Sequence, residues 1–104
     1  MITATARTEE LDAMLVRFEE QYEARTQQLA WLLSRRRSRG MAVSDVAEIA
    51  SCRQALAETA HRLQLMADRD FGRCLQCSGD IPVERLTDRP GVRVCPSCER
   101  AIPV

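Results

Sequence analysis

The sequence lacks lysine, and all fifteen of its basic residues are arginines, which balance fifteen acidic residues to give zero formal net charge over 104 residues. A chain without excess positive charge is not a general nucleic-acid binder, so any contact with nucleic acid has to be local. No charged segment followed by an apolar stretch begins the chain, and no run of about 18 apolar residues occurs. The sequence therefore predicts neither a secretion signal nor a membrane span, and the expected location is the cytoplasm.

Glycine and proline are also scarce, with four of each, and long stretches contain neither. One such stretch runs over residues 8–37 and a second over residues 41–71. Within each stretch, apolar or neutral side chains recur in alternating steps of three and four residues. This heptad pattern predicts two long helices, each with an apolar seam. The first predicted seam contains Leu11, Leu15, Phe18, Tyr22, Leu29 and Leu32, and is interrupted by Arg25. The second contains Val46, Ile49, Leu56, Ala60, Leu63 and Ala67, and is interrupted by Arg53.

The segment between the two predicted helices is short. Gly40 can end the first helix, and Ser44 or Asp45 can cap the second, with Glu48 three residues after Asp45 as in a capping box. Two helices with matching stripes and a short connection pack antiparallel, as a hairpin. At 1.5 Å per residue, helices of roughly 25 to 30 residues give an arm of about 40 Å.

Four of the five cysteines form two CxxC pairs, Cys74/Cys77 and Cys95/Cys98, separated by seventeen residues. Two such pairs predict a tetrahedral site for one structural zinc ion, and four thiolates leave no open position for an activated water. A redox dithiol is disfavoured because no thioredoxin-like βαβ pattern surrounds either pair. Cys52 is interpreted as a small apolar residue beside the second seam, and free thiols fit a reducing compartment.

The predicted fold class is therefore mainly α: a long antiparallel coiled-coil hairpin followed by a small four-cysteine zinc finger. The expected divisions are an N-terminal segment at 1–7, the hairpin at 8–69 with its tip near 38–47, and the finger with a short tail at 70–104. A finger of about 30 residues cannot bury a sufficient core, so the metal is expected to stabilise it. An enzyme is not expected, since the sequence has no open metal site, no His/Glu pair and no glycine-rich phosphate loop.

The finger resembles that of the DksA/TraR zinc-finger family, and the preceding hairpin is similar to the coiled coil of that family. The matching positions are Asp70-Phe71-Gly72, both CxxC pairs, Ile81, Arg85-Leu86 and Arg89-Pro90. The resemblance implies a bacterial regulator that inserts its coiled coil into the secondary channel of RNA polymerase and changes initiation without binding DNA itself. RNA polymerase is the expected partner.

The resemblance extends to two groups of functional residues. The family's DxxDxA tip motif survives in part, because Asp45 and Ala47 match while Ala42 replaces the first acid. Of the basic residues that form part of a guanosine tetraphosphate site, Arg89 is present, but Glu58 and Glu99 occupy the other two positions. Acids there repel phosphates, so the expected response to this nucleotide is weak or absent.

Several features have a second interpretation. Asp45 can serve only as a helix cap, and the arginine run of 35–39 can be a solvated helix end that complements the dipole, or a contact for RNA, DNA or an acidic channel. The alternative function is a zinc-ribbon adaptor that binds another protein or a nucleic acid.

Arg73, Arg93 and Arg100 are expected to offset the negative charge of a zinc ion bound by four thiolates.

Overall fold

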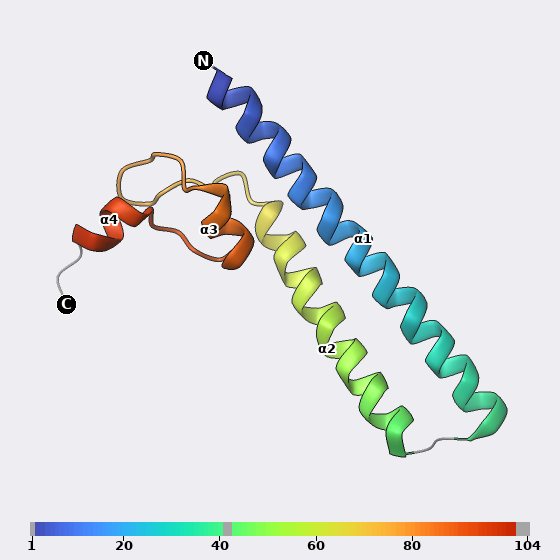
Figure 1. Cartoon of the computed structure of the whole chain (residues 1–104). Helices are drawn as coiled ribbons and strands as arrows, with labels where there is room; N and C mark the ends of the chain where they lie inside the picture. Colours follow the sequence, from blue (N-terminus) through green and yellow to red (C-terminus); the bar gives the residue numbers. More distant parts are fainter. Residues whose placement is uncertain (1, 41–42, 102–104) are drawn as a thin grey trace. The chain divides into compact units, whose positions relative to one another are not determined.

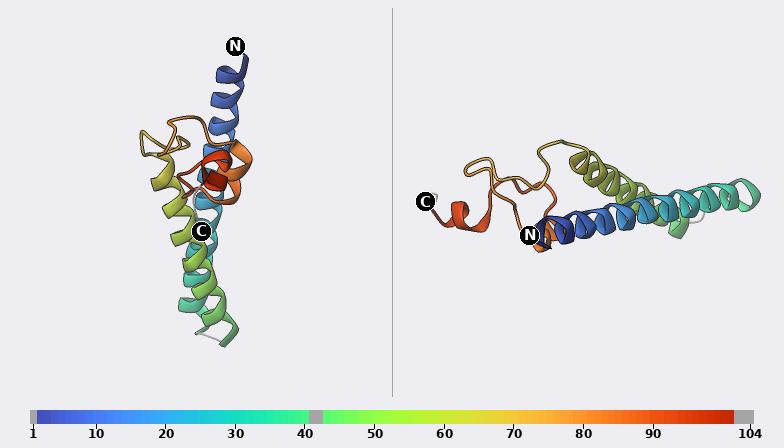
Figure 2. Two further views of the ribbon diagram at one scale, coloured as in Figure 1. Left: turned by 90° about the vertical axis from the view of Figure 1, so that its left-hand side faces the viewer. Right: turned by 90° about the horizontal axis from the view of Figure 1, so that it is seen from above.

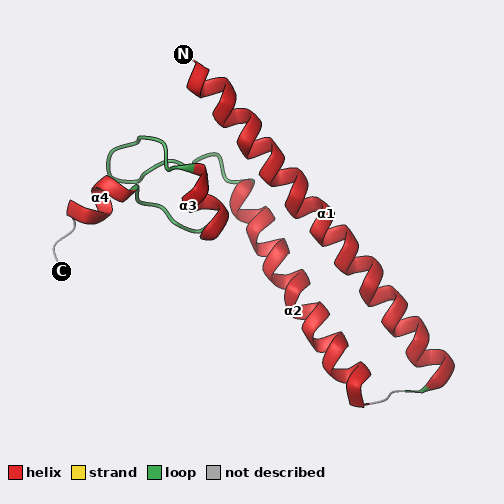
Figure 3. Cartoon of the chain, in the orientation of Figure 1, coloured by secondary structure: helices red, strands yellow, loops and turns green. Residues whose placement is uncertain are grey.

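The computed structural model describes residues 2–40 and 43–101, and most of them are helical (Figures 1 and 3). The elements in chain order are α1 (Ile2–Arg39), α2 (Val43–Met66), α3 (Val83–Asp88) and α4 (Pro96–Ala101). Within the described ranges there is no strand, only an isolated antiparallel bridge between Arg73 and Asp80. The prediction of a mainly helical fold with a long hairpin is confirmed.

The chain divides into two compact units. The first, here called the arm, is Val16–Leu63, and the second, here called the finger unit, combines Met1–Leu15 with Gln64–Val104. The division passes through α1 and α2, so it differs from the expected boundary at residue 70. The expected N-terminal segment at 1–7 is not separate either, because α1 already begins at Ile2.

In the arm, α1 and α2 run side by side in opposite directions (Figures 1 and 2). Leu32, Ile49 and Cys52 form its buried cluster, against which Leu29 and Leu33 pack. Phe18 is buried as well, with the guanidinium carbon of Arg62 5.5 Å from its ring centroid. Two residues of the predicted seams are exposed instead, Tyr22 at 42% and Val46 at 49%. The residues that face inward therefore differ in part from those that apolar character predicts.

The inner face of α2 follows a regular heptad that includes polar residues. Among its buried and half-buried residues, alternating steps of four and three connect Asp45, Ile49, Cys52, Leu56, Thr59, Leu63 and Met66, and the half-buried residues beside this row are Ala55, Ala60, Arg62 and Leu65. Cys52 donates from its Sγ to the carbonyl oxygen of Arg25 at 3.2 Å, and the Thr59 hydroxyl donates to the carbonyl oxygen of Ala55 at 2.9 Å. Because hydrogen bonds satisfy these groups, the seam can bury them at modest cost.

The connection between α1 and α2 starts with a left-handed residue. Gly40 has φ +78° and donates its N–H to the carbonyl oxygen of Arg36 at 2.8 Å, so it ends α1 as predicted. Helix α2 begins at Val43, which places Ser44 and Asp45 inside its first turn rather than at the N-cap position. Two residues of the predicted tip, Met41 and Ala42, lie outside the described residues.

The finger unit is built around Met14, Ile81 and Leu86, which are almost completely buried. Arg7 on α1 connects the two parts of this unit: its Nη1 donates to the carbonyl oxygen of Ile81 at 2.6 Å and its Nη2 to that of Gly72 at 3.0 Å. Its Nε also lies 3.5 Å from a carboxylate oxygen of Asp80. These contacts explain why the first turns of α1 belong with the cysteine-rich segment.

Across the ranges 2–40 and 43–101, no helix combines the length and the apolar character needed to cross a bilayer.

Candidate metal centre

The first CxxC pair lies in a tight loop whose backbone closes on itself. The Ser78 N–H donates to the carbonyl oxygen of Cys74 at 2.9 Å, and the Cys74 N–H donates to that of Gly79 at 2.8 Å. Ser78 adopts a left-handed φ of 62°, which turns the chain after Cys77. Backbone N–H groups also point at sulfur: those of Gln76 and Gly79 donate to Cys74 Sγ and Cys77 Sγ, each at 3.4 Å.

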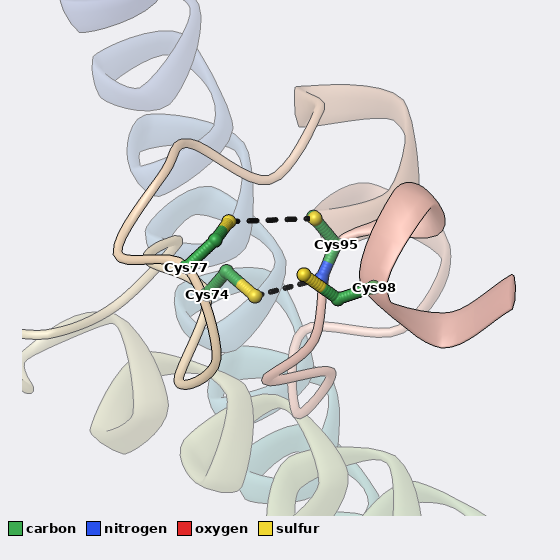
Figure 4. Close-up of side chains that lie close together, drawn as sticks. All are labelled: Cys74, Cys77, Cys95 and Cys98. Carbon is green, nitrogen blue, oxygen red and sulfur yellow. Dashed lines mark hydrogen bonds between the residues drawn. The ribbon is translucent and has the colours of Figure 1, made fainter. Parts of the chain in front are cut away.

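The second CxxC pair lies at the start of α4. Cys95 immediately precedes this helix and accepts a hydrogen bond at its carbonyl oxygen from the Glu99 N–H at 2.9 Å, while Cys98 lies within the helix. The Cys95 N–H donates to Cys74 Sγ at 3.3 Å, which joins the second pair directly to the first (Figure 4). The two CxxC segments thus contact each other through sulfur atoms and backbone N–H groups and not through apolar side chains.

The four sulfurs converge on one point. All four Sγ atoms lie within 4.8 Å of one another, and those of Cys77 and Cys95 are 3.8 Å apart. A tetrahedral zinc ion with Zn–S bonds of about 2.3 Å requires sulfurs about 3.8 Å apart, so the cluster has the dimensions of such a site. The predicted ligands are therefore placed together, and they are compatible with one structural metal ion.

The cluster is sheltered on one side. Cys74 and Cys95 are buried, Cys98 is half-buried and Cys77 is exposed, so an ion would enter past the Cys77 edge. The four ligand atoms are all sulfur, which favours zinc over magnesium or calcium because those ions prefer oxygen. A complete thiolate shell leaves no site for a reactive water, so the chemistry of this donor set is structural.

Two of the thiols have strongly altered acidity. Hydrogen bonds from backbone N–H groups, first that of Cys95, lower the pKa of Cys74 to about 6. Cys98 differs, because hydrogen bonding with the Cys95 and Cys77 side chains raises its pKa to about 12. At neutral pH the metal-free cluster therefore holds a thiolate at Cys74 and a proton at Cys98. A metal ion must displace that proton in order to bind.

The arginines near the cluster are only partly placed as expected. Arg93 lies next to the first pair through its carbonyl oxygen, which accepts from the Leu75 N–H at 2.8 Å, while its guanidinium is 3.5 Å from Asp68. A hydrogen bond from the Asp70 backbone N–H, helped by Arg93, lowers the pKa of Asp68. Arg73 and Arg100 are exposed, so neither is fixed against the sulfurs.

The tip residues occupy different environments. Asp45 is only 5% exposed, and one carboxylate oxygen lies 3.9 Å from Nη2 of Arg35. Ala47, two residues further along α2, is exposed. The expected tip residue Asp45 is thus held against α1, a position that its place in a turn motif did not indicate.

The three residues at the positions of the family's guanosine tetraphosphate site are divided between the two units, with Arg89 and Glu99 in the finger unit and Glu58 in the arm. Arg89 is exposed, and its backbone N–H donates to the carbonyl oxygen of Arg85 at 2.8 Å to cap α3. Glu99 lies 3.3 Å from the guanidinium of Arg85 in the same unit, whereas Glu58 belongs to the arm, where Gln54 donates to it at 3.4 Å.

Sequence reasoning missed Arg7, which holds the carbonyl groups of two distant segments. Its one signal in the sequence is that it is the first charged residue of the chain, and that does not reveal its partners. It also missed the buried places of Met14 and Thr59.

Comparison of the chain with protein-family models, with curated proteins and with solved structures gives no match. The family resemblance therefore depends on the residues quoted for it and on the features of the hairpin and the cysteine cluster.

Proposed function

We propose that the protein is a non-enzymatic, cytoplasmic regulator of bacterial transcription of the DksA/TraR kind, which binds RNA polymerase and inserts the tip of its arm into the secondary channel. The observation that carries the proposal is the combination of a four-cysteine cluster with a helical hairpin in one chain that also has the family's finger residues. Neither feature alone is specific, since hairpins and zinc ribbons each serve many proteins.

The metal in this proposal is one zinc ion bound by Cys74, Cys77, Cys95 and Cys98. The sulfur-only donor set and the 3.8 Å separation of Cys77 Sγ and Cys95 Sγ support this assignment. The ion stabilises the finger and takes no part in chemistry. Arg7 extends that support to α1, because it binds carbonyl groups on both sides of the first cysteine pair.

In this proposal the tip acts through Asp45 and Ala47. A narrow channel favours a rigid probe, and the pairing of Asp45 with Arg35 ties the first turn of α2 to the last turns of α1. Ala47 is exposed and small, which permits close approach by a partner. In this proposal the charge of Asp45 acts from a fixed and largely buried position beside Arg35.

Guanosine tetraphosphate is proposed to have little effect on this regulator. Arg89 is exposed and can meet a phosphate, but Glu99 lies in the same unit and its charge is directed at Arg85. Glu58 contributes a further negative charge at the third family position. Of the three family positions, one therefore holds a basic residue and two hold acidic residues, and acidic residues do not favour a highly charged anion.

The decisive experiment is binding of the zinc-loaded protein to purified bacterial RNA polymerase core enzyme, measured with a fluorescent label on the protein. We expect saturable binding that a known secondary-channel factor displaces competitively. A chain with Cys74→Ser serves as a control for the requirement for an ordered finger. Absence of binding, or binding that the channel factor does not displace, would contradict the proposed function.

A further inference from the structure

The charges of this neutral chain are distributed very unevenly. Residues 24–44 contain five arginines and no acidic residue, which leaves ten arginines and fifteen acids for the rest of the chain. This segment covers the second half of α1 and the connection to α2. The end of the arm therefore has a strong local positive charge, the kind of contact that zero net charge does not exclude.

An exposed aromatic residue lies within this basic segment. Trp31 is 59% exposed, an unusual state for a large apolar side chain, and the guanidinium carbon of Arg35 lies 5.3 Å from the centroid of its ring. Arg35 is held in turn by Asp45 at 3.9 Å. Arg35 thus holds the indole in place, and Asp45 holds Arg35. The indole can therefore bind a flat ligand without first having to be ordered.

Arg36 and Arg37, which follow directly, are both exposed. Arginine binds phosphate through a planar fork of donors, and an exposed indole stacks on nucleobases whatever their sequence. An acidic protein segment would use the arginines but would leave the indole without a role. A duplex would satisfy the arginines but keeps its base faces stacked and inaccessible.

We propose that Trp31, Arg35, Arg36 and Arg37, here called the basic end, bind single-stranded RNA. One base stacks on Trp31, and phosphates further along the strand pair with Arg36 and Arg37, which lie about a third of a turn or more around α1 from Trp31. We assign the single strand to RNA because cellular DNA is chiefly duplex, whereas RNA has unpaired bases that can stack on aromatic rings. The inference goes beyond the proposed function, since it requires no polymerase and concerns the isolated protein.

The chain provides its own probe, because Trp31 is its only tryptophan. Titration of the zinc-loaded protein with an oligouridylate of about 12 nucleotides should quench the tryptophan fluorescence, since a stacked base contacts the emitting ring. With about two phosphates neutralised, at Arg36 and Arg37, the logarithm of the association constant should fall against the logarithm of salt concentration with a slope of about −1.4. Absence of quenching at about 50 mM salt would overturn the proposal.

Charge-matched variants assign the phosphate contacts. The double variant Arg36→Gln/Arg37→Gln should reduce the magnitude of the salt slope by about 1.4. The control variant Arg17→Gln/Arg53→Gln changes the net charge equally at two exposed arginines of the arm outside the basic end. It should leave the slope unchanged. Equal effects of the two variants would show that only overall charge matters, and would overturn the assignment.

The stacking contact is tested with labelled RNA, whose anisotropy does not depend on tryptophan. Trp31→Ala should weaken binding about tenfold or more, while Tyr22→Ala, at another exposed aromatic residue of α1, should have little effect. Equal losses would contradict a stacking site at Trp31. Polyglutamate or duplex DNA that quenches as well as oligouridylate would overturn the choice of a single strand, and tighter binding of oligothymidylate would overturn the choice of RNA.

Discussion

The guanidinium of Arg7 lies directly against the backbone of Gly72. Its Nη2 donates to the Gly72 carbonyl oxygen at 3.0 Å, and a Cβ atom on Gly72 would stand only 2.8 Å from the same nitrogen. Gly72 also has φ +78°, a conformation that side chains disfavour. Two constraints therefore meet at this residue: the backbone needs glycine, and Arg7 occupies the space of a side chain.

Replacement of Gly72 by alanine should destabilise the finger unit by more than the left-handed backbone alone requires. Gly40→Ala is the matched control, because Gly40 has the same φ of +78° and, among the described residues, no atom lies within 4 Å of the added Cβ. The control should cost about 1 to 2 kcal/mol in free energy of unfolding, and Gly72→Ala a further 1 to 3 kcal/mol or so as Arg7 loses its carbonyl partners. Denaturant unfolding measures the free energy of unfolding of both variants. Equal losses would show that Arg7 moves away from the added Cβ without a loss of stability.

Loss of one ligand should abolish stoichiometric metal binding. Cys74→Ser or Cys98→Ser removes a thiolate from the cluster, whereas Cys52→Ala removes the thiol outside it. We expect the first two proteins to lose bound zinc and hydrogen-exchange protection over residues 70–98, because metal-binding energy of about 10 kcal/mol or more stabilises such small sites. Metal analysis and hydrogen exchange measure the two effects. Cys52→Ala should still bind one ion, and zinc retained by both serine variants would refute the four-sulfur site.

Zinc affinity should rise with pH. Since the pKa of Cys98 is about 12, zinc must expel its proton at any pH near neutrality, which alone gives about a tenfold gain in affinity for each pH unit. Cys74, with a pKa of about 6, adds one further proton to be expelled only below that value, so the dependence should steepen in acid. Competition with a chromophoric chelator between about pH 5.5 and 7.5 measures this slope. A pH-independent affinity would rule out thiol ligands.

Asp45→Asn should separate binding from regulation in the proposed function. Asparagine preserves the shape of the side chain and removes its charge, and Arg35 keeps its contact with Trp31. Because Arg35 is partly exposed, we expect the arm to lose about 1 kcal/mol or less. Affinity for polymerase should stay within a few-fold, while regulation of a sensitive promoter in vitro should be largely lost. If the Asn variant regulates as well as the parent, Asp45 only joins the two helices.

The extent to which the sequence predicts this molecule depends on how local each feature is. The absence of glycine and proline identified both long helices, and the CxxC spacing identified all four residues of the cluster. Apolar character did not identify the inner face of α2, because that face includes Asp45, Cys52 and Thr59. Asp45 and Cys52 have partners on α1 that only the fold supplies, whereas the Thr59 hydroxyl bonds the Ala55 carbonyl oxygen within α2.

Arg7 shows the limit more clearly. Its two carbonyl partners are 65 and 74 residues away along the chain, and they converge on it only when the loops before and after the first cysteine pair have formed. A lone arginine near the start of a helix does not reveal such partners. Contacts distant in sequence likewise join Met1–Leu15 to the cysteine-rich segment in the finger unit.

Asp45, Cys52 and Thr59, whose side chains all carry hydrogen-bonding groups, are spaced by seven on the inner face of α2, so each heptad of the arm buries one of them. A slip of α2 by one heptad would keep every polar residue at a seam position, yet it would carry Asp45 away from Arg35 and Cys52 away from the Arg25 carbonyl oxygen. Buried polar residues are known to fix the alignment of coiled coils at some expense of stability. The arm therefore has a single preferred alignment, which an uninterrupted leucine seam would not provide.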